Sequence, residues 1–183
     1  MTSFTAQSSA QSAKADKIVA VVQGEYRISR DKDVVLSTVL GSCVAACIFD
    51  TDIGIGGLNH FLLPGDKRSG QVELKYGSMA MELLINELLK AGARRSGMKV
   101  KLYGGARISA GLSDIGAKNI AFARDYVRRE GFPVVDESLG GTQARRIHFR
   151  PVNGEVRLNL VAPTQAPTEK VERPKKAADV TLF

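Results

Sequence analysis

Short apolar runs separated by turn-forming residues dominate the chain from about residue 17 onward. The runs are rich in Val, Ile, Leu and Phe, and Gly, Pro, Asn or Asp stand between them, which is the pattern of strands joined by turns. It predicts strands over residues 17–22, 34–39, 44–49, 58–63, 100–103, 132–136, 145–149 and 155–160. The last two are joined at Asn153-Gly154, a dipeptide that favours a tight hairpin turn.

Two longer segments have the spacing of an amphipathic helix instead. In the first, apolar residues recur along one helical face, at Met81, Leu84, Ile85, Leu88 and Leu89. Ser78 is placed to cap this helix, which we expect to run to about Arg95. The second helix is predicted over residues 117–130 and ends at Gly131. Strands and helices together predict a single domain of mixed α/β class.

The two ends of the chain differ in composition from this central part. Residues 1–16 are rich in Ser, Ala, Gln and Thr, and residues 163–183 mix proline with charges of both signs. Such segments bury too little apolar surface to fold. We therefore expect a disordered N-terminal tail, a domain over residues 17–162 and a flexible C-terminal tail. The last four residues, VTLF, are either a docking peptide or a frayed end.

The formal net charge of +7 favours acidic partners: nucleic acid, anionic lipid or a carboxylate-rich protein surface. Aromatic residues make up only 6% of the chain and Trp is absent, so bases would find few side chains to stack on, and we predict no nucleic-acid binding. The positive charge is concentrated in residues 90–129, where ten Lys and Arg stand against two Asp. A docking face for acidic helices and an ordinary solvated surface are both open interpretations.

No targeting or membrane signal stands out in the sequence. The N-terminus lacks the apolar core of a signal peptide, and no apolar run reaches the roughly 18–20 residues needed to cross a bilayer. In an extended segment Cys43 and Cys47 would lie about 13 Å apart, which is too far for a disulfide. We therefore expect a reduced, cytoplasmic protein that does not insert into membranes.

Cysteine and histidine are the candidate reactive side chains, and the chain has two of each. Cys43 follows a Gly41-Ser42 turn between two predicted strands, where small residues let the backbone approach a substrate and offer N–H groups to an oxyanion. Cys47 lies inside an apolar run and is interpreted as a buried hydrophobic residue. His60 lies on the next predicted strand, which could pair with the strand that carries Cys43. A Cys–His pair is the minimum for a thiol hydrolase, although His60 could also be an ordinary core or surface histidine.

The second histidine and the option of a zinc site have weaker support. His148 alternates with arginines on a predicted edge strand, which favours a structural or solvated role. A Cys-x3-Cys spacing on a strand is poor for one zinc ion, and the two histidines are 88 residues apart, whereas zinc sites place them a few residues apart. We therefore predict neither a metal nor a cofactor.

Six stretches of the sequence, in their order and spacing, resemble the CheD family of chemoreceptor glutamine deamidases. They are residues 34–46 (VVLSTVLGSCVAA), 56–64 (GGLNHFLLP), 76–89 (YGSMAMELLINELL), 102–106 (LYGGA), 115–126 (IGAKNIAFARDY) and 140–149 (GGTQARRIHF). The resemblance covers about residues 20–161, and its most specific pieces are the GSC turn and the segment around His60. It implies a fold in which helices pack on a mixed β-sandwich, similar to the catalytic domains of deamidating bacterial toxins.

The resemblance also implies an activity and the residues that perform it. Members of the family hydrolyse selected glutamine side chains of methyl-accepting chemotaxis receptors to glutamate, with release of ammonia and without a cofactor or metal. Matched by motif, Cys43 is the nucleophile and His60 the base. The third catalytic position, six residues before the cysteine, falls on Ser37, with Thr38 next to it. Which of these two hydroxyls orients His60 stays open.

A second kind of function is implied as well. Proteins that resemble CheD bind a CheC-type phosphatase in some bacteria. The alternative function is therefore a mainly non-catalytic regulatory module that binds the receptors and this phosphatase. An intact pair of Cys43 and His60 favours the enzyme.

Overall fold

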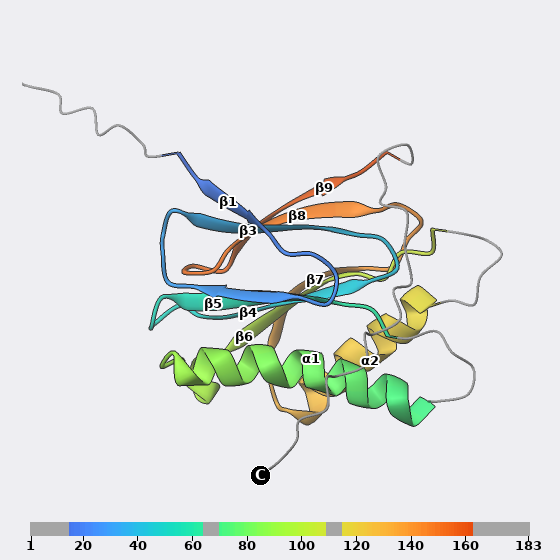
Figure 1. The fold of residues 1–183 in the computed structure, drawn as a ribbon, viewed down its shortest axis with the longest axis horizontal. Helices are drawn as coiled ribbons and strands as arrows, with labels where there is room; N and C mark the ends of the chain where they lie inside the picture. Colours follow the sequence, from blue (N-terminus) through green and yellow to red (C-terminus); the bar gives the residue numbers. More distant parts are fainter. Residues whose placement is uncertain (1–14, 64–69, 109–114, 163–183) are drawn as a thin grey trace, which may run out of the picture.

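Two stacked β-sheets form the centre of the molecule in the computed structural model, which describes residues 15–63, 70–108 and 115–162 (Figure 1). One sheet has four strands, in the order β1 (Lys17–Ala20), β3 (Val34–Leu40), β8 (Arg145–Arg150) and β9 (Glu155–Leu160). The other has five strands, in the order β2 (Tyr26–Ser29), β5 (Ile55–Phe61), β4 (Val44–Asp50), β6 (Lys99–Gly104) and β7 (Val134–Leu139). Neighbouring strands are antiparallel except for the pairs β1–β3 and β6–β7, which are parallel. Both sheets are therefore mixed.

Two helices cover the five-stranded sheet on the side that faces away from the four-stranded sheet (Figure 1). They are α1 (Gly70–Lys90) and α2 (Ile115–Arg129), and a short 3-10 turn at Arg95–Gly97 leads from α1 toward β6. This arrangement confirms the predicted mixed α/β fold with helices packed on a mixed β-sandwich. No helix in the described part of the chain is long and apolar enough to cross a membrane.

Strand β4 lies at the centre of the molecule, and all seven of its residues are buried. A strand that is covered on both faces has a continuous apolar sequence, and successive side chains point to opposite faces. Val44, Ala46 and Ile48 therefore pack toward the helices. Cys47 and Ala45 pack between the two sheets. The residue just before the strand, Cys43, belongs to the same inter-sheet layer.

Strand β5 begins earlier than predicted, at Ile55, and β2, which pairs with it, was not predicted. The predicted strand began at residue 58, but Gly56 and Gly57 also lie within β5. A Cβ atom at Gly57 would lie 2.6 Å from Leu84 Cδ1, and one at Gly56 would lie 2.5 Å from the Pro151 carbonyl oxygen. These glycines therefore permit close packing on both faces of β5 rather than a turn.

The predicted bounds of the first helix are wrong at both ends. Ser78 does not cap α1 but lies inside it, and the helix ends at Lys90, well before Arg95. Gly77, next to Ser78, permits close packing within the helix, because a Cβ atom there would lie 2.6 Å from the Phe122 ring. The helix ends near Gly92, whose positive φ of 93° is the left-handed conformation that commonly ends helices.

Strand β8 was predicted to be an edge strand, and this is wrong. It lies between β3 and β9. The hairpin after β8 places β9 at the edge of the sheet, and β3 pairs with the other side of β8. The elements run from Lys17 to Leu160. The predicted tails, apart from residues 15 and 16, and the VTLF segment lie outside the described residues.

Candidate active site

Cys43 lies where the chain passes from one sheet to the other. Strand β3 belongs to the four-stranded sheet and β4 to the five-stranded sheet, so the Gly41-Ser42-Cys43 turn connects the two layers. The cysteine is 3% exposed. The Cys43 side chain therefore lies at one end of the inter-sheet layer, between the two sheets.

The loop after β6 fixes the backbone of this turn. The N–H of Gly105 donates to the Cys43 carbonyl at 2.7 Å, and the N–H of Ala106 donates to the Gly41 carbonyl at 2.8 Å. Gly104 has a φ of 115°, and a Cβ atom there would lie 2.1 Å from the Cys43 carbonyl oxygen. The Gly104-Gly105 pair is therefore required for the loop to approach the turn this closely.

The strand register brings His60 to the same face as Cys43. Strands β4 and β5 pair antiparallel, with Ala45 opposite His60 and Val44 opposite Phe61. Continuing this register by one residue places Cys43 opposite Leu62, so Cys43 and His60 are diagonal neighbours on one face. Diagonal neighbours on paired strands lie roughly 7–8 Å apart at their Cα atoms, within reach of long side chains. The predicted pairing of the two strands is confirmed.

Thr38 holds the imidazole from the opposite sheet. Its Oγ1 lies 2.8 Å from His60 Nδ1, and both side chains are 6% exposed. The Val21 carbonyl oxygen lies 3.5 Å from the same nitrogen. Ser37, the next residue along β3, faces the other side of its strand, where it is half-buried opposite His148. The structure thus brings Thr38, and not Ser37, to His60.

Asn119 of α2 connects the segments that carry Cys43 and His60. This side chain is fully buried. Its Oδ1 accepts the Leu63 N–H at 2.8 Å, and its Nδ2 donates to the Ser42 carbonyl at 3.0 Å. Leu63 is three residues beyond His60 and Ser42 directly precedes Cys43, so one amide fixes both segments relative to each other.

Gln23 covers the thiol from the loop between β1 and β2. Cys43 Sγ donates to Gln23 Oε1 at 3.4 Å. The Gln23 side chain is exposed, whereas the cysteine beneath it is not. The thiol of the candidate nucleophile is therefore hydrogen-bonded to a carboxamide of its own chain.

The family model for CheD chemotactic sensory transduction matches residues 62–160 of this chain. A probable chemoreceptor glutamine deamidase CheD of a Caulobacter species is 53% identical over 165 residues, which cover 89% of this chain and 87% of the relative. The chain belongs to the CheD family. A relative of the same name from Caulobacter vibrioides is 51% identical over 174 residues, with 90% and 92% of the two chains covered. Among solved structures, the Bacillus licheniformis hypothetical protein YfiH has 11% identity and a TM-score of 0.44, over 68% of this chain and 60% of its own.

The remaining cysteine and histidine of this CheD chain lie apart from the site. Cys47 is fully buried between the sheets, and burial raises the pKa of its thiol, as expected for the predicted buried hydrophobic residue. His148 borders a surface hollow on the outer face of the four-stranded sheet, which contains neither Cys43 nor His60. Within residues 15–63, 70–108 and 115–162, no three His, Cys, Asp or Glu side chains are grouped to hold a metal ion.

Two contacts of the CheD site were missed by the sequence analysis. Asn119 could have been found, because it shares the buried face of α2 with Phe122 and Ala123 at helical spacing, and a polar residue on such a face needs partners. Gln23 carried no such signal. It follows a short strand in an exposed loop, and only the folded chain brings it to Cys43.

Proposed function

We propose that this chain is a protein-glutamine deamidase that converts glutamine side chains of methyl-accepting chemotaxis receptors to glutamate. The observation that supports this best is the arrangement of Cys43, His60 and Thr38, in which a buried hydroxyl holds Nδ1 of an imidazole placed diagonally to a thiol. The names of the relatives, chemoreceptor glutamine deamidases, support the substrate. The reaction takes place in the cytoplasm in this proposal.

His60 acts as the base through Nε2. The Val21 carbonyl beside Nδ1 can only accept a hydrogen bond, which favours the tautomer with its proton on Nδ1. Nε2 then has a lone pair to accept the Cys43 proton, and the thiolate attacks the carbonyl carbon of the glutamine amide. The C–N bond remains intact in this step, and the carbonyl oxygen becomes an oxyanion.

The Cys43 N–H is the backbone donor that we assign to this oxyanion. Asn119 holds the Ser42 carbonyl, and a trans peptide is planar with its C=O and N–H pointing in opposite directions. The Cys43 N–H therefore points away from α2. A donor fixed before the reaction stabilises developing charge without reorganisation.

Collapse of the tetrahedral intermediate breaks the C–N bond. Protonated His60 gives its proton to the leaving nitrogen, so ammonia departs and a thioester on Cys43 remains. Water, deprotonated by the same imidazole, then hydrolyses the thioester to glutamate and regenerates the thiol. The sum is glutamine plus water to glutamate plus ammonia, and these steps use only side chains and backbone groups of this chain.

Ammonia release from a glutamine-bearing receptor fragment tests the proposal, together with the mass gain that replacement of NH2 by OH produces. Cys43→Ala should abolish both while circular dichroism shows an intact fold. Cys47→Ala is the matched control, because it removes the other thiol from the same inter-sheet layer, and it should retain activity. Equal activity of the native protein and Cys43→Ala would refute the thiol mechanism.

The low exposure of Cys43 favours one alternative, a regulatory module that binds receptors and a CheC-type phosphatase without catalysis. In that case the native protein and Cys43→Ala bind a receptor fragment equally well and neither releases ammonia. Pull-down of the phosphatase with each variant would then measure the partner interaction directly.

A further inference from the structure

The thiol of Cys43 is covered although the proposed reaction requires a glutamine side chain to reach it. At 3% exposure, the sulfur cannot accept a second carboxamide unless a neighbouring group moves. Gln23 is such a group, because its amide oxygen is in contact with the sulfur at 3.4 Å. Since its side chain is exposed, it can rotate into solvent without disturbing the core.

The backbone beneath Gln23 is fixed on both sides. The Val21 N–H donates to the Ser37 carbonyl at 2.8 Å, and the Gly24 N–H donates to the His60 carbonyl at 2.7 Å. The His60 N–H donates in turn to the Glu25 carbonyl at 3.0 Å. These hydrogen bonds hold the loop in place, so the group that can move away from the thiol is the exposed Gln23 side chain. Rotation about the side-chain bonds of Gln23 is sufficient.

We propose that the Gln23 carboxamide occupies the position that the substrate carboxamide takes, and that the substrate displaces it. The proposal rests on the function proposed above and identifies the group that the site recognises as a glutamine side chain. Gln23 has the same length and the same terminal amide as the substrate residue. The atom in contact with the sulfur is its carbonyl oxygen, so the contact is a hydrogen bond from the thiol rather than the start of an attack on carbon.

The rate at which iodoacetamide alkylates Cys43 in the full chain tests this directly. Gln23→Ala should react about two- to tenfold faster than the native protein, because the thiol loses a competing hydrogen bond and its cover. Peptide mass locates the label, and Cys47 stays unlabelled because it is fully buried. Val22→Ala is the matched control: it changes an exposed side chain of the same loop and should react at the native rate. Equal rates for Gln23→Ala and the native protein would overturn the proposal.

Two further measurements separate a carboxamide position from simple shielding. Gln23→Met keeps the length of the side chain without its carbonyl, so it should react nearly as fast as Gln23→Ala; protection equal to that of glutamine would overturn the proposal. Propionamide, the free carboxamide, should slow alkylation in Gln23→Ala more than in the native protein, and propionate should not. Absence of any propionamide effect in Gln23→Ala would also overturn it.

Kinetics on the receptor fragment connect this contact to the proposed function. Gln23→Ala should lower KM about two- to tenfold with kcat unchanged, because the substrate no longer displaces an internal competitor. Alkylation needs no receptor, so the two proposals fail separately. Deamidation with no change in alkylation refutes only the role of Gln23, whereas faster alkylation without deamidation refutes only the receptor activity.

Discussion

Thr38 gives His60 a neutral partner. A hydroxyl at Nδ1 fixes the orientation of the ring but, unlike the carboxylate of a serine-protease triad, adds no negative charge beside an imidazolium. A thiol is more acidic than a serine hydroxyl and needs less help to ionise. In the proposed mechanism the contribution of Thr38 is therefore orientation, and losing it should slow the reaction without abolishing it.

Thr38→Val removes this hydroxyl and keeps the branched shape that packs between the sheets. We expect kcat for deamidation to fall roughly ten- to hundredfold, because His60 loses the short hydrogen bond to Thr38 and keeps only the longer contact to the Val21 carbonyl. Steady-state kinetics measure the effect. Ser37→Ala decides between the two hydroxyls: it should cause a much smaller loss, and a loss as large as that of Thr38→Val would contradict the role of Thr38.

The adjacent pair Ser37 and Thr38 shows how much of the site the sequence contains. Strand side chains alternate, so Leu36, Thr38 and Leu40 share the buried face of β3. The sequence alone does not reveal this face, because Val35 and Val39 flank Ser37 just as Leu36 and Leu40 flank Thr38. The pairing of the strands that carry Cys43 and His60, by contrast, was predictable from two short strands joined by a turn. The contact of Gln23 with Cys43 depends on the three-dimensional path of a loop and was not.

At the scale of elements, the turn that carries Cys43 is held by segments much later in the chain. The loop after β6 bonds to Gly41 and Cys43, and Asn119 of α2 bonds to Ser42. The turn itself consists of three small residues, which have no long side chains to fix its conformation. Its geometry is therefore set by α2 and by the end of β6.

Asn119→Asp tests this dependence. The aspartate keeps an acceptor for the Leu63 N–H but loses the donor to the Ser42 carbonyl, so we expect kcat to fall roughly tenfold or more while KM changes little. Steady-state kinetics on the receptor fragment separate the two constants.

Asn59→Asp is the matched control for this variant. Asn59 is a second buried amide that accepts a strand N–H, from Ala46, and donates to a carbonyl, of Ala80. Both variants should lose stability to urea. If kcat falls as much in Asn59→Asp as in Asn119→Asp, the fall is due to general destabilisation of the fold and not to a change in the Cys43 turn.

Elements with strong periodicity were predictable, and elements defined by their neighbours were not. Strand β9 has the predicted bounds, residues 155–160, because a hairpin turn fixes one of its ends. Strand β2 has only four residues without a fully buried position, and it is a strand because β5 pairs with it. The glycines within β5 and α1 are sites of close packing whose partners lie far away in the sequence, so their role could not be predicted.

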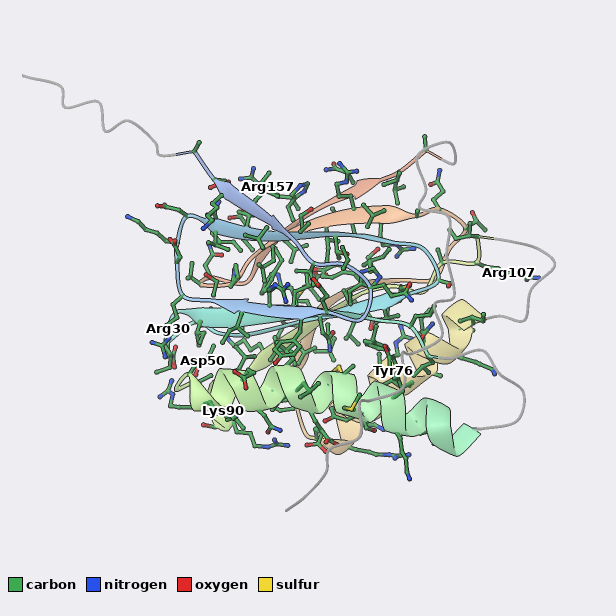
Figure 2. The ribbon with its side chains drawn as sticks, viewed as in Figure 1. Arg30, Asp50, Tyr76, Lys90, Arg107 and Arg157 are labelled. Carbon is green, nitrogen blue, oxygen red and sulfur yellow. The ribbon has the colours of Figure 1, made fainter. Side chains whose placement is uncertain are left out.

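At the scale of the whole molecule, Asp50 organises the end of the sandwich opposite the site. Figure 2 shows Asp50 and Arg107 at opposite ends, and Arg107 directly follows the loop that binds the Cys43 turn. The Asp50 carboxylate accepts N–H groups from Arg94 at 3.0 Å and Asp52 at 3.1 Å. A Cβ atom at Gly97 would lie 2.6 Å from its Oδ2. The carboxylate thus joins the end of β4 to the segment after α1.

Asp50→Asn should reduce stability in a pH-dependent way. Burial alone would raise the pKa of Asp50, but the N–H donors and the Arg94 charge outweigh it, so the pKa lies below the ordinary value of 3.8. A lowered pKa stabilises the folded protein above that value and the stabilisation is lost as pH falls below it. We expect a loss of about 1–3 kcal/mol in the free energy of unfolding at pH 7.

Urea denaturation at several pH values measures this difference. The gap between the native protein and Asp50→Asn should be constant from pH 7 down to about 5 and shrink below pH 3.8. A gap that stays constant through the acid range would contradict the role of the charged carboxylate. Ammonia release should change little at pH 7, because the substitution is at the far end from Cys43.

Part of the positive charge of the basic stretch 90–129 is neutralised within the molecule. Five of its six arginines form ion pairs with nearby carboxylates: Arg94 with Asp52, Arg95 with Glu130, Arg124 with Glu137, and Arg128 and Arg129 with Asp125. Exposed pairs of this kind add little stability. They do reduce the field that would attract an acidic partner, which favours the interpretation of a solvated surface over that of a docking face.

Because Asn119 holds the Cys43 turn, the site can be complete only after α2 has been synthesised. A ribosome releases Cys43 and His60 long before α2, and β6 also follows them. A growing chain therefore contains Cys43, His60 and Thr38 before it contains Asn119 and the loop after β6, which hold the Cys43 turn. If the proposed mechanism holds, a chain still in synthesis becomes able to deamidate only after helix α2 has docked, and the Cys43 thiol of an unfinished chain is not yet positioned to react.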